Sequence, residues 1–371
     1  MNYAALTMAV LVSYLAGISP LSASDWPVPR GNAQATGASS DQVPSEPELL
    51  WELPLGGTGF EGTPVVAKQT IYLGDVDGRV VAVDLKSGKL KWEQKFETGF
   101  TAPASVNGDQ VTIGDFDGKL HALKTSDGSE IWSFETESQI DAAASYFGSN
   151  LLITSEDGNL YCLKQSDGTL VWKYETGDQL RCGATLSGNR TFLGGCDGKL
   201  HIVDVEKGTS ALEEAASLEA PTGSTPAVHD GVAFVPTHAG DLFAIKADDG
   251  SQVWKLHDQK LAQEFQNSVA IADGLVIASS HNRRVFALDL KSGQKQWETT
   301  LRKRADSSPA IAGDKVVVAA TDGRVMLFDL KTGGELWMTE VKGSFLASPA
   351  IADNRIIVAS DKGTVYCFGA R

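Results

Sequence analysis

A regular spacing of tryptophan residues constrains this chain more than any other feature. Successive members of the series are separated by 41, 40, 40, 82, 43 and 40 positions, and the interval of 82 is a double step. The series consists of Trp51, Trp92, Trp132, Trp172, Trp254, Trp297 and Trp337. The missing member falls near Leu212, which follows Gly208 by four residues. From Trp92 onwards, each of these tryptophans also has a glycine four positions before it. The seven tryptophans and Leu212 therefore define eight repeat slots.

Each repeat unit contains four short runs of residues that favour β-strands. In one unit these are TPVV (63–66), TIYLG (70–74), VVAVD (80–84) and the segment around Trp92, with an Asp-Gly turn at 77–78. Four strand-like runs separated by tight turns, repeated about every 40 residues, are typical of a propeller blade. A single blade cannot bury both of its faces, whereas blades packed in a ring can.

The two ends of the repeat region complement each other. The last unit, from Ala347, has three runs and reaches Arg371 without a tryptophan strand, while the segment LLWEL (49–53) has no three runs before it. We therefore predict an all-β, eight-bladed β-propeller over residues 49–371, with four-stranded antiparallel blades and a ring closed by the N-terminal strand. The alternative of seven blades would leave one unit unexplained. The tryptophans are expected to fill the wide outer gaps between neighbouring blades.

The segment before the repeats has two parts. Residues 1–24 carry no charged side chain, contain an apolar run from Ala4 to Ile18, and end in small residues, which predicts a cleaved signal peptide; an uncleaved anchor is the alternative. Residues 25–48 form a leader segment. No cysteine lies near the cleavage point, so we expect an exported protein in the periplasm or outside the cell that is not a lipoprotein. The formal charge of −15 argues against nucleic acid as a main partner.

The tryptophan segments carry a family resemblance. AVDLKSGKLKW (82–92) and ALDLKSGQKQW (287–297) resemble the tryptophan-docking repeat of pyrroloquinoline-quinone (PQQ) propellers, and the leader DWPVPRGNAQATGAS (25–39) is similar to a stretch found in secreted bacterial relatives. The resemblance implies two possible classes. One comprises quinoprotein dehydrogenases that bind PQQ and Ca²⁺, and the other comprises BamB-type scaffolds of outer-membrane assembly, which carry no cofactor.

The sequence favours the scaffold class. The units are uniform, which leaves little room for the large insertions of the dehydrogenases, and the chain has neither adjacent cysteines nor a C-x-x-C-H haem motif. We expect a non-catalytic monomer that binds protein partners through its rim loops, in a BamB-like role and without a cofactor. The alternative is a small PQQ- and Ca²⁺-dependent dehydrogenase of alcohols or sugars. For that reading, Glu61, Asn267 and Asp306 at the funnel rim are the candidate residues.

Two loops are predicted to bring basic side chains together on one face. LRKRA (301–305) connects two units, and SHNRR (280–284) replaces the usual Asp-Gly turn of the earlier unit. The predicted cluster consists of Arg283, Arg284, Arg302, Lys303 and Arg304. Such a cluster could hold an acidic partner, although an ordinary solvated surface is the alternative. In the loop DQLRC (178–182), Leu180 and Arg181 are a second candidate contact, with Leu180 expected to be exposed.

The remaining polar and sulfur-bearing side chains are assigned structural roles. Cys162 and Cys367 occupy a slot that holds alanine in other units and are expected in the core. A disulfide between Cys182 and Cys196 stays open, although a tight turn at 188–189 would place the two on opposite faces. The histidines at 121 and 201 are expected to pack rather than to bind metal. The acidic segment 211–221 lacks the tryptophan and is either a contact site or a poorly docked strand.

Overall fold

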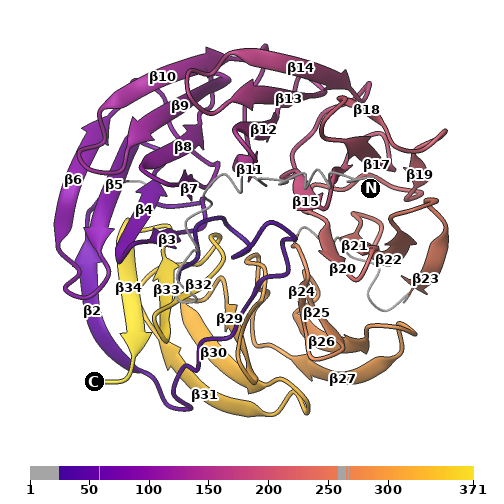
Figure 1. Cartoon of the computed structure of the whole chain (residues 1–371). Helices are drawn as coiled ribbons and strands as arrows, with labels where there is room; N and C mark the ends of the chain where they lie inside the picture. The colour runs from indigo at the N-terminus through magenta and orange to yellow at the C-terminus, as the bar shows by residue number, and fades with distance from the viewer. Residues whose placement is uncertain (1–24, 58, 258–264, 266) are drawn as a thin grey trace, which may run out of the picture.

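The computed structural model describes residues 25–57, 59–257, 265 and 267–371, so the predicted signal peptide lies outside the described residues. Within these ranges every helix or strand assigned is a β-strand, and the strands form eight sheets around a central channel (Figure 1). None of the described residues forms a helix of the length and apolar character needed to span a bilayer. The predicted eight-bladed β-propeller is confirmed. We number its blades in chain order from the blade that begins at Val65.

The strands of each blade run from the channel outwards. The innermost strands are β3 (Val65–Ala67), β7 (Ser105–Asn107), β11 (Ser145–Phe147), β15 (Thr185–Ser187), β20 (Ala227–His229), β24 (Ala270–Ala272), β28 (Ala310–Ala312) and β32 (Ala350–Ala352). The second strands are β4 (Thr70–Gly74), β8 (Gln110–Gly114), β12 (Asn150–Thr154), β16 (Arg190–Gly194), β21 (Val232–Pro236), β25 (Leu275–Ser280), β29 (Lys315–Ala319) and β33 (Arg355–Ala359). The third strands are β5 (Arg79–Asp84), β9 (Lys119–Lys124), β13 (Asn159–Lys164), β17 (Lys199–Asp204), β22 (Asp241–Lys246), β26 (Arg284–Asp289), β30 (Arg324–Asp329) and β34 (Thr364–Gly369). The outer strands are β6 (Leu90–Lys95), β10 (Glu130–Glu135), β14 (Leu170–Glu175), the pair β18 (Thr209–Ser210) and β19 (Ala216–Ser217), β23 (Gln252–His257), β27 (Lys295–Thr300), β31 (Glu335–Glu340) and β2 (Glu48–Pro54).

The eighth blade closes the ring as predicted. Its outer strand β2 comes from the N-terminal side of the propeller and pairs antiparallel with β34, so that Trp51 lies opposite Cys367 (Figure 1). The residue opposite the tryptophan is small in most blades, as with Ala82 opposite Trp92, because the large ring turns towards the neighbouring blade. Closure covers an edge of β34 that would otherwise present unpaired backbone groups.

Six tryptophans contact the following blade in the same way: Trp51, Trp92, Trp132, Trp172, Trp254 and Trp297. The indole nitrogen of Trp92, for example, donates to the carbonyl oxygen of Thr125 at 2.9 Å. The ring lies so close to Gly128 that a Cβ there would sit 2.7 Å from it, and Gly128 has a φ of +74°. The same close approach identifies the seats of the six rings, which are Gly88, Gly128, Gly168, Gly208, Gly293 and Gly333. This confirms that the tryptophans fill the gaps between blades.

The fourth blade is irregular at its outer edge. Two short segments, β18 and β19, both pair with β17 and leave residues 211–215 between them. Leu212 replaces the tryptophan and approaches Gly250, whose added Cβ would lie 2.8 Å from the leucine. The smaller side chain therefore still occupies the docking seat, and the acidic segment is a docked but interrupted strand. Whether it also contacts a partner stays a prediction.

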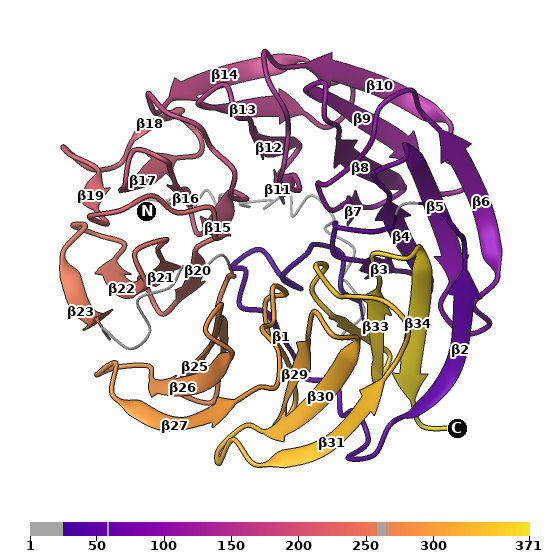
Figure 2. The same ribbon diagram turned by 180° about the vertical axis from the view of Figure 1, so that it is seen from behind.

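The leader segment lies across the central channel and pairs with the innermost strands (Figure 2). The central residue of six inner strands donates its backbone N–H to a leader carbonyl oxygen at 2.8 to 2.9 Å. These bonds join Val66 to Trp26, Val106 to Pro27, Leu186 to Ala33, Val228 to Gln34, Ile271 to Thr36 and Ile311 to Gly37. The short strand β1 (Ala38–Ser39) continues the contact as a parallel partner of β28. The leader thus satisfies donors that would otherwise face the channel.

Candidate functional site

The loops at one end of the ring bring two basic segments together. We call this end the loop face; it carries the connections between successive blades and the turns between the second and third strands. Arg283, in the turn between β25 and β26, lines a shallow hollow together with Lys303 and Arg304 from the loop after β27. Arg302 is exposed beside them. We define Arg283, Arg302, Lys303 and Arg304 as the basic patch, and its convergence agrees with the sequence prediction.

The charges of the patch are only partly neutralised. Arg304 forms an ion pair with Asp306 at 2.9 Å, and Arg284 contacts the carboxylate of Glu298. Arg284 therefore turns away from the patch, although it was predicted to belong to it. Within the described part of the chain, Arg283, Arg302 and Lys303 have no carboxylate within ion-pair distance. Three unpaired cations thus face solvent on a protein of net charge −15.

The backbone at Arg283 is unusual. Its φ is +68°, in the left-handed region that glycine adopts readily and other residues adopt at a cost. The equivalent turns of the other seven blades all have glycine, with φ between +68° and +90°. These glycines are Gly78, Gly118, Gly158, Gly198, Gly240, Gly323 and Gly363. An arginine in this slot costs about 1 kcal/mol of conformational free energy, and the strain coincides with the basic patch.

The prediction that Leu180 is an exposed anchor is wrong. Its side chain is fully buried in the cluster between blades 3 and 4. The repeat explains why, because Phe100 and Ile140 hold the same position in their units and are also buried. Arg181 is exposed as expected and forms an ion pair with Glu156 at 2.7 Å. This loop lies between blades 3 and 4, away from the basic patch between blades 6 and 7.

The three residues proposed for a Ca²⁺ site do not converge. The side-chain amide of Asn267 donates to the hydroxyl of Ser279 and to the carbonyl oxygen of Ala305, at 2.9 and 2.8 Å. Asp306 pairs with Arg304, while Glu61 is exposed on a different blade. Among the described residues, no group of three His, Cys, Asp or Glu side chains is placed to hold a metal ion. Asn267 and Asp306 are therefore committed to other contacts and Glu61 lies apart from them, so the three do not fit that ion.

The cysteines and the histidines at 121 and 201 make packing and hydrogen-bond contacts within the fold. Cys162 and Cys367 are buried in the core as predicted, and Cys182 and Cys196 are free thiols rather than a disulfide. The Cys182 sulfur accepts the N–H of Gly194. His121 packs against Phe96 with ring centroids 4.6 Å apart and lies between two carboxylates. His201 packs edge-on against Tyr174, with ring centroids 5.9 Å apart.

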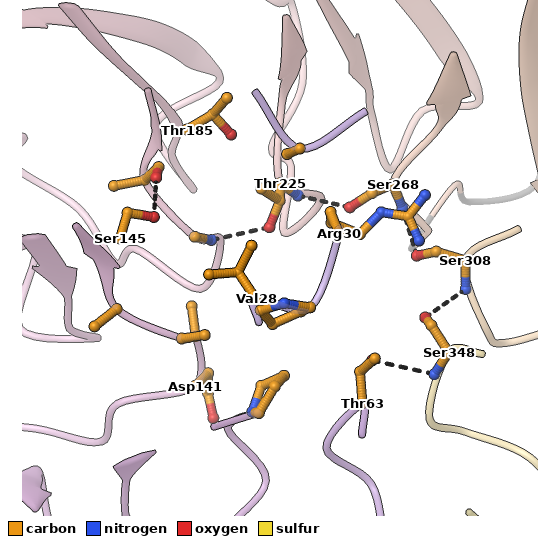
Figure 3. A pocket seen from close by; sticks show the side chains of 18 of the residues that line it. Val28, Arg30, Thr63, Asp141, Ser145, Thr185, Thr225, Ser268, Ser308 and Ser348 are labelled. Carbon is orange, nitrogen blue, oxygen red and sulfur yellow. Dashed lines mark hydrogen bonds between the residues drawn. The ribbon is translucent and has the colours of Figure 1, made fainter. Parts of the chain in front are cut away.

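A central cavity of about 190 Å³ lies between the leader and the loop face (Figure 3). Val28, Pro29 and Arg30 of the leader line it, together with the residues that enter the inner strands. Five of those residues carry hydroxyl groups: Thr63, Thr225, Ser268, Ser308 and Ser348. The residues that enter blades 2, 3 and 4 interrupt this set with Pro103, Ala143 and Gly183. Sequence reasoning missed the hydroxyl set, although the shared repeat position of its members was a usable signal.

The hydroxyl groups link one blade to the next. The backbone N–H of Ser268 donates to the hydroxyl of Ser308 at 3.0 Å, and the N–H of Ser308 donates to the hydroxyl of Ser348 at 2.9 Å. The same contact recurs from Gly183 to Thr225, Thr225 to Ser268, and Ser348 to Thr63. We call Thr225, Ser268, Ser308, Ser348 and Thr63 the hydroxyl arc.

An eight-bladed ring fastened by docked tryptophans defines a PQQ-like β-propeller. Residues 40–145, 116–333 and 282–371 match the protein family described as outer membrane protein assembly factor BamB. These matches together span residues 40–371, and the chain belongs to this family.

Individual relatives share only part of their length or a low sequence identity with this chain. BamB of Salmonella typhimurium and BamB of Escherichia coli are each 30% identical to this chain over 91 residues, which is 23% of the chain and 23% of the relative. The chain thus aligns with about a quarter of the length of these curated relatives. BamB from Moraxella catarrhalis superimposes with a TM-score of 0.75 at 20% identity, covering 87% of this chain and 100% of that one. The quinohemoprotein alcohol dehydrogenase of Comamonas testosteroni gives 0.79 at 15% identity, covering 94% and 81%. Both structural likenesses concern the fold alone.

Proposed function

We propose that this chain is an exported, non-catalytic scaffold that binds an acidic protein surface through the basic patch on its loop face. The observation that carries the proposal is the convergence of Arg283 with Lys303 and Arg304 from two separate loops. Cations that lie on a rigid ring can attract and orient a partner of opposite charge. The chain is itself acidic, so the patch is a local reversal of its charge.

The strained turn supports a role in binding. Glycine serves the same turn in the other seven blades, so the fold does not require an arginine there. A residue that costs conformational free energy and presents a charge with no ion-pair partner among the described residues is better explained by a contact than by stability. A role in outer-membrane protein assembly, as the names of the relatives state for them, is part of the proposal for this chain.

We further propose that partner binding needs neither a quinone nor a metal ion. Asn267 and Asp306 are engaged in other contacts, and the leader is hydrogen-bonded to six inner strands within the channel. The proposed location is the periplasm or the extracellular space, and the proposed oligomeric state is a monomer.

The experiment compares two sets of charge reversals. In the first, Arg283→Glu, Arg302→Glu and Lys303→Glu are combined on the loop face. In the second, Lys86→Glu, Lys291→Glu and Lys331→Glu change the charge equally in exposed turns at the opposite end of the ring. Proteins that co-purify from envelope extracts are identified, and their recovery is followed as salt is raised.

We expect the loop-face variant to lose a co-purifying partner that the control variant keeps. We also expect salt to weaken the wild-type interaction, because exposed charges are screened over about 8 Å at physiological ionic strength. Equal recovery with both variants would contradict the proposal. A calorimetric titration with PQQ and Ca²⁺ tests the other class, and saturable binding there would favour the dehydrogenase.

A further inference from the structure

The central cavity is lined by a buried cation that has no counter-ion among the described residues. The Arg30 side chain extends from the leader beneath the hydroxyl arc, next to Ser268 and Ser308 (Figure 3). Only 6% of the residue is exposed. Its Nη2 atom donates to the carbonyl oxygens of Val269 and Pro309, at 3.0 and 2.7 Å. These two bonds fix the guanidinium in place.

The rest of the guanidinium is unpartnered in the part of the chain that the structure describes. The Nε and Nη1 atoms are buried, and neither makes a hydrogen bond within the described part of the chain. Nor does any carboxylate of residues 25–57, 59–257, 265 or 267–371 form an ion pair with Arg30. Burial without a compensating charge lowers the pKa of Arg30 to about 10, which still leaves it protonated at neutral pH. A buried charge in this condition is destabilising unless an anion or water compensates it.

The hydroxyl arc supplies further donors to the same cavity. Each of its five oxygens accepts a backbone N–H from the neighbouring blade. None of the five hydroxyls donates a hydrogen bond to another group in the described residues, so their protons remain available. A hydroxyl group has one donor and two acceptor positions, and here an acceptor position is used. The polar groups on this side of the cavity are therefore mainly donors.

We propose that the central cavity binds a carboxylate group, held by the free N–H of Arg30 Nη1 and the hydroxyl protons of Ser268, Ser308 and Ser348. Nη2 takes part in both edges through which a guanidinium can bind a carboxylate by two parallel hydrogen bonds, and Nη2 is already bonded to Val269 and Pro309. A carboxylate here therefore accepts a single charge-assisted hydrogen bond from Nη1, and the serine hydroxyls supply the others. This site lies in the channel rather than on the basic patch, so it does not depend on the proposed scaffold function.

The size of the cavity limits the ligand. A volume of about 190 Å³ is below the 300–1,000 Å³ typical of pockets for larger organic ligands. The carboxylate must therefore belong to a small organic acid or to the C-terminus of a peptide. The one carboxylate that lines the cavity, that of Asp141, lies on the blade 3 side. It accepts hydrogen bonds from Thr101 and Gln139, which keeps it at the rim.

The first test measures binding of acetate to the purified protein by isothermal titration calorimetry. Acetamide is the matched neutral ligand, and sodium chloride at equal ionic strength controls for screening. Triglycine with a free C-terminus and triglycine amide distinguish a peptide source from a free acid. We expect saturable one-to-one binding of acetate or of free triglycine and no binding of the two amides. If no carboxylate binds in preference to its amide, the proposal is wrong.

The second test places a carboxylate inside the cavity by substitution. Ser308→Asp keeps an oxygen that can accept the N–H of Ser268 and puts a negative charge beside Arg30. Ser308→Asn is the matched neutral variant and keeps the same acceptor. We expect Ser308→Asp to raise the melting temperature in the absence of ligand and to weaken carboxylate binding by about ten-fold or more. Ser308→Asn should do neither. Equal behaviour of the two variants would overturn the proposal.

Discussion

The indole nitrogen of Trp297 donates a hydrogen bond to the carbonyl oxygen of Leu330 in the following blade, at 2.9 Å. The same bond joins Trp51 to Leu85 and Trp254 to Leu290. Because the contact recurs from blade to blade, the ring is fastened by one device at many points. Its strength depends on how closely the next blade can approach the indole ring.

Gly333 is the seat of Trp297, and adding a methyl group there should destabilise the ring. A Cβ on Gly333 would lie 2.4 Å from the indole, and the residue has a φ of +69°. We expect Gly333→Ala to lower the free energy of unfolding by about 2–4 kcal/mol, since it adds overpacking to backbone strain. Gly108→Ala is the control, because Gly108 has a φ of +63° but open space around it. Urea unfolding that gives equal losses for both variants would show that docking contributes little.

Removing the leader should weaken the propeller. Deletion of residues 25–47 exposes six inner-strand N–H groups to the channel and leaves the outer strand β2 intact. Each lost hydrogen bond contributes about 0.5–1.5 kcal/mol, so we expect a decrease of several kcal/mol in the free energy of unfolding. The comparison is the protein that lacks only residues 1–24 and therefore keeps the leader. Unchanged urea midpoints would mean that water replaces the leader without loss.

The buried thiols predict a loss of stability in alkali. Burial raises the pKa of Cys162, Cys182 and Cys367 to about 12, from an ordinary value of 9.0. These thiols ionise at lower pH in the unfolded chain, so deprotonation favours unfolding as the pH rises from 9 towards 12. The stabilisation is fully present below pH 9, and the slope above it is about 1.4 kcal/mol per pH unit for each group.

Alanine substitutions of two of these thiols supply the control. Alanine occupies the equivalent slot in other blades, for example Ala82, so Cys162→Ala and Cys367→Ala should fold normally. Unfolding measured from pH 7 to pH 11 should then show a shallower decrease for the double variant. A decrease as steep as that of the wild type would assign the pH dependence to other groups.

Arg283 should lower the stability of the fold and strengthen partner binding. Arg283→Gly relieves the left-handed strain and should raise the free energy of unfolding by about 0.5–1 kcal/mol. The same change removes an unpaired charge from the basic patch and should weaken capture of the partner. Arg302→Gly, at an exposed loop position without a positive φ, should weaken capture without raising stability. If Arg283→Gly leaves both quantities unchanged, the turn has no special role.

The repeat made most of the fold predictable. The spacing of the tryptophans, the glycines before them and the unmatched ends of the repeat region together predicted eight blades and the closing strand β2. Convergence of the two basic loops was also predictable, because their places in consecutive strands define one end of a blade. Periodic side-chain patterns determine all of these features, and such patterns can be recognised in a single sequence.

Other features of the structure have no clear pattern in the sequence. The leader contacts the inner strands through backbone carbonyl groups, which any residue provides, so its place in the channel has no side-chain pattern. Leu180 seemed to belong to an exposed loop, yet alignment with Phe100 and Ile140 would have shown that the slot turns inwards. The burial of Arg30 is not predictable, because a single arginine in an irregular segment belongs to no pattern that indicates burial.

The most direct test of the scaffold account is site-specific crosslinking in the native envelope. A photo-reactive amino acid replaces Arg302 in the basic patch or, as the control, exposed Lys291 in a turn at the opposite end of blade 6. The account predicts a discrete crosslinked protein from position 302 that is absent from position 291 and is lost when Arg283 and Lys303 are changed to Glu. Crosslinks that are equal at both positions, or absent from position 302, would contradict it.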